Sequence, residues 1–230
     1  RETMSVVISQ EETAKEILLA KGIDSKIMSY EIHDMVEEDN RITAATVNMP
    51  LYKAYNAIKG TGNALTLPVV HCVRNDEQTV VAGNGIALFE GDKLVGFLNA
   101  KDSMYYLFFK NEIEGGALSF PVSKADDSVS LEIKDCKTDV VVSVRDEQAF
   151  VTLSVDVKLK VMEIKSQLSL NQAGGRKALE QQTAAYLQTG ITEFFKKVQT
   201  ENKMDIFGLG RQLYQKTPDL WESMEDDWNQ

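Results

Sequence analysis

The chain of 230 residues carries 35 Asp and Glu residues against 25 Lys and Arg residues, which gives a formal net charge of −10. No basic cluster offers the positive face with which proteins displace counterions from nucleic acid, so we predict no nucleic-acid partner. The hydrophobic content of 43% is enough for a folded core. No apolar run approaches the ~20 residues of a membrane-spanning helix. Because the chain opens on Arg1 rather than on methionine, we expect a fragment of a longer protein.

The first 76 residues are predicted to mix strands and helices. Helix starts are indicated by acidic residues or proline in a first turn, and helix ends by glycine. In chain order we expect a strand at Ser5–Ser9 and helices over residues 11–22, 26–38 and 50–59.

Residues 77–124 are predicted to form a β-hairpin followed by a helix. The segment TVVAGNGIALFEGDKLVGFLN holds two apolar runs around EGD, with Gly91 in the turn. Its AGNGIALF stretch has only the first two glycines of a dinucleotide-binding loop, so we interpret these as a bulge or tight crossing. A helix is expected over residues 101–112, with Asn99 or Asp102 at its entry.

Residues 125–230 show the most regular pattern. Val129–Ile133 and Val140–Val144 are expected as separate strands, following one at residues 117–122. A loop at Arg145–Gln148 leads into Phe150–Val161, where apolar and polar residues alternate strictly. This period of two indicates an antiparallel sheet with one buried face.

A long helix is predicted over residues 176–200, with one apolar stripe that fits across the buried sheet face. The stripe consists of Ala184, Leu187, Ile191, Phe194 and Val198. The predicted fold class is therefore α+β, with antiparallel sheets and packed helices. We divide the chain into domains at residues 1–76, 77–124 and 125–230.

No pattern of catalytic or metal-binding residues stands out in the sequence. GxSxG, HExxH and CxxC motifs are absent, and neither His33 nor His71 has an evident sequence partner. We interpret the distant Cys72 and Cys136 as buried free thiols, while a disulfide between them stays open. We predict no enzyme activity, no cofactor and no metal.

The segment DIFGLGRQLYQKTPDLWESMEDDW, residues 205–228, holds both tryptophans of the chain. Asp205 is expected to cap a short helix, and Thr217 to cap a second helix with Pro218 at its first position. In that second helix Trp221, Met224 and Trp228 would share one face.

Two glycines fall inside the first of these helices, and each costs about 1 kcal/mol against alanine. Their presence in the helix therefore needs an explanation. One explanation is close packing of the short helix on the long helix or the sheet. The other is a docking surface for another protein. The candidate residues of this partner-contact or structural motif are Asp205, Phe207, Gly208, Gly210, Pro218, Trp221 and Trp228.

Several stretches together resemble the spore germinant receptor C subunits, the Ger(x)C family. DIFGLGRQLYQKTPDLW resembles the family's C-terminal signature, and GNGIALFEGDKLVGFLN resembles its hairpin. TAKEIL and LTLPVV resemble earlier landmarks in the same order. The resemblance covers essentially the whole chain, but the family's signal peptide, lipobox cysteine and opening strands have no counterpart in it.

The resemblance implies a lipoprotein of endospore-forming bacteria with a three-domain α+β fold and no known enzyme activity. It implies an N-terminal lipid anchor on the outer face of the spore inner membrane. It also implies A-type and B-type membrane subunits as partners in a nutrient germinant receptor. We therefore expect assembly and signalling through protein contacts. The alternative is a nutrient-binding module, with Tyr105–Tyr106 and Phe108–Phe109 lining a cleft.

Overall fold

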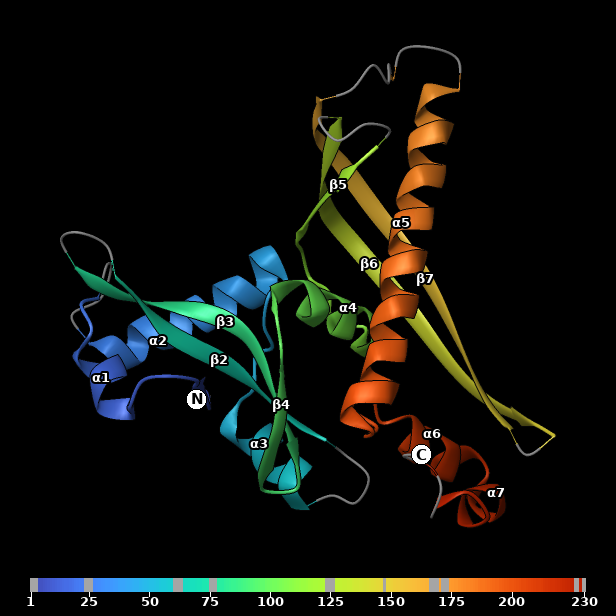
Figure 1. The fold of residues 1–230 in the computed structure, drawn as a ribbon, viewed down its shortest axis with the longest axis horizontal. Coiled ribbons are helices and arrows are strands. Elements are labelled where there is room, and N and C mark those ends of the chain that lie inside the picture. Colours follow the sequence, from blue (N-terminus) through green and yellow to red (C-terminus); the bar gives the residue numbers. More distant parts are fainter. Residues whose placement is uncertain are drawn as a thin grey trace.

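A computed structural model of the chain describes residues 4–22, 27–59, 64–74, 78–122, 127–146, 148–165, 170, 174–225 and 228. Two sheets lie toward opposite ends of an elongated molecule, and helix α4 (Ala100–Lys110) lies between them (Figure 1). The predicted α+β class is confirmed. None of the helices that the structure describes is long and apolar enough to cross a bilayer.

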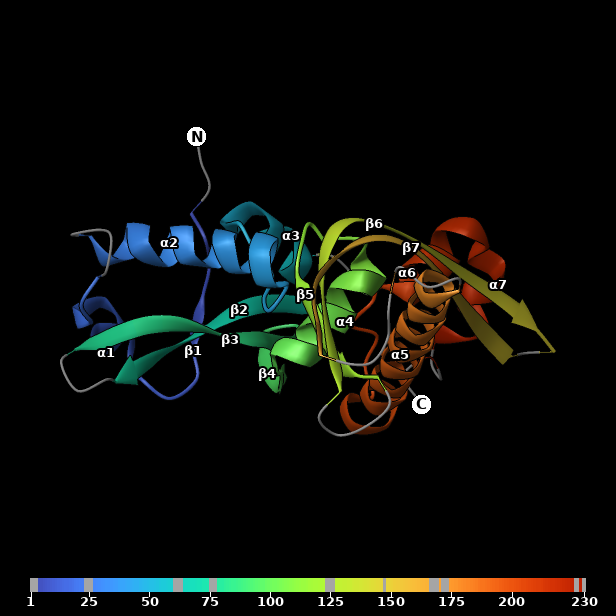
Figure 2. The same ribbon diagram turned by 90° about the horizontal axis from the view of Figure 1, so that it is seen from above.

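The first sheet has the strand order β1-β2-β3-β4, with β1 parallel to β2 and the other pairs antiparallel. Helices α2 and α3 lie on one side of it (Figure 2). The bounds are β1 Ile8–Ser9, α1 Ala14–Leu19, α2 Met28–Glu38, a π-helical turn η1 Asp39–Thr43, α3 Leu51–Lys59, β2 Leu65–Arg74, β3 Thr79–Glu90 and β4 Lys93–Leu98.

Strand β2 was missed by the sequence analysis, and Pro68 lies within it. Proline has no backbone N–H, so it is normally confined to strand positions where this group would have no partner strand. Because β1 pairs only with Val69 and Val70, the β1-facing side of Pro68 has no strand partner among the described residues. β2 pairs with β3 across the boundary predicted at residue 76, and the division into three domains stays a prediction.

The glycines of AGNGIALF allow a tight crossing, as predicted. Gly85 has a φ of 90°, and a Cβ at this position would overlap the carbonyl oxygen of Leu98. The β2–β3 register shifts next to it. The Thr46 hydroxyl donates a hydrogen bond to the Gly85 carbonyl at 2.8 Å. The stretch therefore belongs to a β-bulge and not to a dinucleotide loop.

Asp39, which follows α2, is a half-buried acidic residue. Burial raises the pKa of its carboxyl, and the neighbouring Glu38 raises it further. Since the folded state then binds more protons than the unfolded chain, stability falls as pH rises from the unfolded to the folded pKa. We expect Asp39→Asn to increase the free energy of unfolding at neutral pH by no more than about 1 kcal/mol, and to flatten its pH dependence in urea titrations.

Asp34→Asn is the matched control, because Asp34 lies on the exposed face of α2. It removes the same charge without relieving burial. We expect a change within about 0.5 kcal/mol. Equal stabilisation by both variants would assign the effect to net charge and contradict the role of burial.

Helix α4 forms the centre of the largest hydrophobic core, which joins both sheets. Asn99 caps it, with its Oδ1 accepting a hydrogen bond from the Asp102 N–H at 2.9 Å. Asp102 instead accepts a hydrogen bond from Lys197 Nζ at 2.8 Å, which raises the pKa of Lys197. This pair connects α4 to helix α5. All four aromatic residues proposed to line a nutrient cleft are buried in this core: Tyr105, Tyr106, Phe108 and Phe109.

The second sheet has the order β5-β6-β7, all antiparallel. The two strands predicted at Val129–Ile133 and Val140–Val144 are one continuous strand, β6. The apolar alternation is broken there by a register shift between Ile133 and Asp135 and by Thr138, a polar residue that is buried on the inner face. The charged residues of this stretch are exposed, and Asp135 accepts a hydrogen bond from Lys158 at 2.6 Å. The bounds are β5 Ala117–Pro121, β6 Ser128–Arg145 and β7 Gln148–Lys165.

Helix α5 (Gly175–Lys197) runs along the inner face of this sheet and continues into a π-helical turn, η2 (Val198–Asn202) (Figure 1). Four of the five predicted stripe residues are buried, but Ala184 is exposed. The inward side chains of β6 are mostly buried, whereas those of β7 are half-buried. The helix therefore covers β6 more fully than β7.

Candidate functional site

The carboxylate of Asp205 is the centre of the C-terminal region. Its Oδ1 accepts hydrogen bonds from the backbone N–H groups of Phe207 at 3.1 Å and Gly208 at 2.8 Å. Its Oδ2 accepts from the Gly210 N–H at 2.7 Å and from the indole Nε1 of Trp228 at 3.1 Å. One side chain thus binds the start of a helix to the last described residue.

Helix α6 spans Leu209–Lys216, so it begins later than predicted. Gly208 is its N-cap, with a left-handed φ of 75°, and lies before the helix rather than inside it. A Cβ on Gly210 would lie 2.5 Å from two ring carbons of Trp221 and 2.9 Å from Trp228 Nε1. Gly210 is therefore closely packed, but against the tryptophans and not against the long helix or the sheet.

Helix α7 (Pro218–Glu222) is only five residues long, so the predicted helix that places both tryptophans on one face is wrong. The chain turns after α7 and brings Trp228 back to Trp221, with ring centroids 5.3 Å apart in an edge-on arrangement. Pro218 is exposed at the first helical position, as predicted. Thr217 occupies the N-cap, but its hydroxyl donates to the Leu213 carbonyl instead of capping α7.

Phe207 is buried, with 6% of its surface exposed. Its ring centroid lies 4.3 Å from that of Phe109 and 5.5 Å from that of Phe195. Lys110 Nζ donates a hydrogen bond to its carbonyl oxygen at 3.3 Å. Phe207 therefore anchors the C-terminal region in the main core, while Trp221 and Trp228 are half-buried and Tyr214 of α6 is exposed.

The carboxylate of Asp205 has a structural role in this arrangement. Both oxygens of Asp205 accept backbone or indole N–H groups, so the carboxylate is occupied. No group of three metal-ligating side chains occurs among the described residues. Elsewhere, His33 Nδ1 lies 2.7 Å from the Ser5 hydroxyl, and both cysteines are free and half-buried. Whether the motif contacts a partner stays a prediction.

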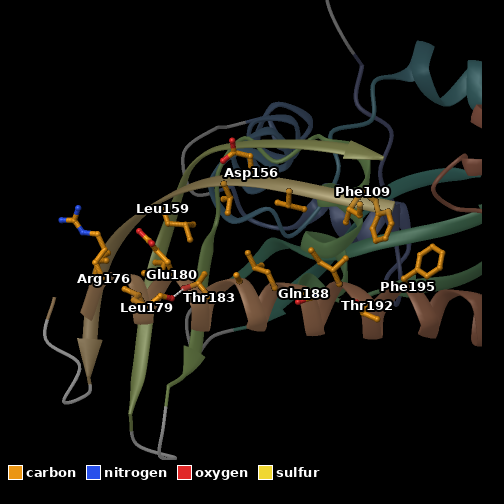
Figure 3. Close-up of a pocket in the computed structure, with 18 of the residues that line it drawn as sticks. Phe109, Asp156, Leu159, Arg176, Leu179, Glu180, Thr183, Gln188, Thr192 and Phe195 are labelled. Atoms are coloured by element: carbon orange, nitrogen blue, oxygen red, sulfur yellow. Dashed lines mark hydrogen bonds between the residues drawn. The ribbon is translucent and has the colours of Figure 1, made fainter. Parts of the chain in front are cut away.

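A long apolar groove between β7 and α5 was not foreseen from the sequence. Its volume is about 1100 Å³. Figure 3 shows Arg176 and Glu180 at one end of the groove and Phe109 and Phe195 at the other. The half-buried apolar side chains of β7 form one wall. The alternation in the β7 sequence indicated an inward face, but it carried no signal that α5 would leave this face partly open.

A second cavity of about 790 Å³ continues this groove toward the C-terminal region. The two share Val151 and Phe195 as lining residues. The second is also lined by Asp205, Phe207 and Trp228. The groove along β7 therefore reaches the carboxylate-centred motif.

Comparisons with known proteins agree on one family. A family model described as "Spore germination B3/GerAC like, C-terminal" matches residues 84–230. Spore germination protein KC of Bacillus subtilis (strain 168) is 23% identical over 205 residues, which cover 89% of this chain and 49% of that protein. Spore germination protein B3 of the same organism is 24% identical over 167 residues, covering 70% of this chain and 43% of that protein.

A solved structure of the GerBC protein has the same fold. It matches with a TM-score of 0.72 over 96% of this chain and 62% of that chain, at 18% identity. The chain spans about half the length of the curated relatives it matches. The region matched by the family model includes α4, the whole second sheet, the groove and the Asp205 motif.

Proposed function

Because this chain belongs to the spore germination B3/GerAC-like family of germinant receptor C subunits, we propose that it acts in a nutrient germinant receptor. In this proposal it is part of a non-enzymatic lipoprotein subunit. It takes part in receptor assembly and signalling for spore germination through protein contacts. Its partners are the A-type and B-type membrane subunits. An N-terminal lipid anchor holds the whole protein on the outer face of the spore inner membrane.

The proposal is supported mainly by the way in which the C-terminal region is held in place and its aromatic residues are exposed. Asp205 holds α6 against Trp228, and Phe207 anchors the same segment in the core. This leaves Trp221 and Trp228 half-buried and Tyr214 54% exposed. Tryptophan and tyrosine on a rigid support are the residues that most often dominate protein–protein binding energy. We therefore place the partner contact on α6, α7 and the turn that follows.

The test is co-purification. The full-length protein is tagged, spore membranes are extracted in mild detergent, and the recovered proteins are identified. We expect the A-type and B-type subunits in a constant ratio to the tagged protein. Recovery of the tagged protein alone would overturn the assembly role.

A nutrient panel separates assembly from ligand binding. A ligand that binds only the folded state raises its melting temperature in a saturable way. The four aromatic residues of this alternative, Tyr105, Tyr106, Phe108 and Phe109, are buried in the core with 7% or less of their surface exposed. Only Phe109 lines the groove beside β7, so we expect no saturable shift. A saturable rise with one nutrient would favour the binding-module alternative.

A further inference from the structure

The outer edge of β7 is a long strand edge that the proposed function does not use. Among the described residues, the sheet order leaves β7 paired with β6 alone. The strand is 18 residues long, and no backbone hydrogen bond from it to any other described segment is found. An open edge of this length is a template for adding another strand.

The described residues cover the apolar face of β7 only in part along the same edge. Val151, Leu153, Val155, Val157, Leu159 and Val161 are all only half-buried, and they line the groove beside α5. A strand added to β7 would place every second side chain on this face. Apolar residues at those positions would extend the wall of the groove and remove apolar surface from water.

The charges on the solvent face of the sheet indicate which strand fits. Asp156 of β7 lies opposite Lys137 of β6, and Lys158 lies opposite Asp135. The two neighbouring charges of β7 therefore have opposite signs, two residues apart on one face. An antiparallel strand with the same order of charges would oppose each of them with its complement.

We propose that two copies of this chain pair through antiparallel β7 strands, with Val157 opposite Val157 of the partner copy. A two-fold axis perpendicular to the sheet keeps each residue on its own face. Asp156 then lies opposite Lys158 of the partner copy, and Lys158 opposite the partner's Asp156. Lys137 and Asp135 of β6 already lie opposite Asp156 and Lys158. Across the four central strands of the dimer, the charges in each row therefore alternate in sign.

Other registers oppose the wrong charges. A two-fold axis at Leu159 places Lys158 opposite Lys160 of the partner copy. An axis at Asp156 opposes this residue with its own copy, and an axis at Val155 opposes Asp156 with serine. An axis at Lys158 places Asp156 opposite the partner's Lys160 but opposes Lys158 with its own copy at the centre. Like charges directly opposite one another are unfavourable. The same charges that protect the edge from unspecific pairing therefore select one register.

The apolar face is self-complementary in this register. Val155 lies opposite Leu159 of the partner copy, and Leu153 opposite the partner's Val161. The pairing spans the regular part of β7 and ends beside the bulge at Met162. It produces one continuous six-stranded sheet with a groove on each side of the two-fold axis. The pairing does not depend on the proposed receptor role.

Sedimentation velocity of the chain between about 1 and 100 µM tests the pairing. We expect a reversible monomer–dimer equilibrium. The substitutions Asp156→Lys and Lys158→Asp each make the opposed charges alike, and each should weaken the dimer at least about tenfold. Both side chains are on the exposed face of β7, so thermal unfolding should show that the folded state is kept.

The decisive experiment is sedimentation of a mixture of the two variants. In a mixed dimer the Asp156→Lys chain opposes the Lys158→Asp chain with two pairs of unlike charges, so dimers should return. Monomers at every concentration of the unsubstituted chain would overturn the proposal. So would a dimer that both variants preserve, because it would use another surface. Failure of the mixture to dimerise would contradict the register.

Discussion

Asp205→Asn is expected to lower the free energy of unfolding by about 3 kcal/mol, although it replaces only one carboxylate oxygen with an NH2 group. The amide oxygen can keep the bonds to Phe207 and Gly208. The amide nitrogen then faces two donors, the Gly210 N–H and the Trp228 indole, and it cannot accept from either. Urea unfolding measures the loss, and tryptophan fluorescence should report the release of Trp228 at lower denaturant.

Asp219→Asn is the matched control, because Asp219 is exposed in the first turn of α7. It removes the same charge, and the only interaction lost is the favourable one with the helix dipole. We expect a loss below about 1 kcal/mol. If Asp205→Asn were no more costly than this control, the carboxylate would not organise the C-terminal region.

Gly190→Ala is expected to destabilise the protein by about 2 kcal/mol, against the sign of helix propensity. A Cβ on Gly190 would overlap the hydroxyl and Cζ of Tyr105 and lie 3.1 Å from its Cε1. Tyr105 is only 3% exposed, and its ring lies 6.1 Å from that of Phe194, so it has no room to turn away. Thermal or urea unfolding measures the change.

Two further variants isolate this contact. Gln188→Ala, at an exposed position of α5, should change stability by no more than about 0.5 kcal/mol. In a Tyr105→Leu background the cost of Gly190→Ala should largely disappear, which a double-mutant cycle measures as coupling. A cost that is equal in both backgrounds would rule out the clash with Tyr105.

Local patterns predicted most of the helices and the second sheet. Period-two alternation marked β7, and a stripe spaced by three and four residues marked α5. The errors came from long-range context. β6 looked like two strands because a bulge after Ile133 and the buried polar residue Thr138 interrupt its apolar alternation. β2 was hidden by Pro68, which is tolerated where β1 does not pair. Neither the interruption within β6 nor the short pairing of β1 with β2 can be recognised within a short window of sequence.

The candidate site was predicted in part. The sequence singled out Asp205, both glycines and both tryptophans as one motif, and the structure brings them into contact. It did not show that Trp228 folds back onto Asp205, because a turn after α7 replaces the continuous helix. The groove depends on how far α5 lies from β7, which no local pattern encodes.

The most direct test of the contact region compares receptor recovery for two exposed tyrosines. Tyr214 of α6 is 54% exposed beside the Asp205 motif, and Tyr30 of α2 is 62% exposed in the other half of the molecule. Each is replaced by alanine in the tagged full-length protein, and the A-type and B-type subunits that co-purify from spore membranes are quantified. We predict that Tyr214→Ala lowers their recovery severalfold and that Tyr30→Ala leaves it unchanged. Equal recovery with both variants, at equal melting temperatures, would contradict a receptor contact on α6 and α7.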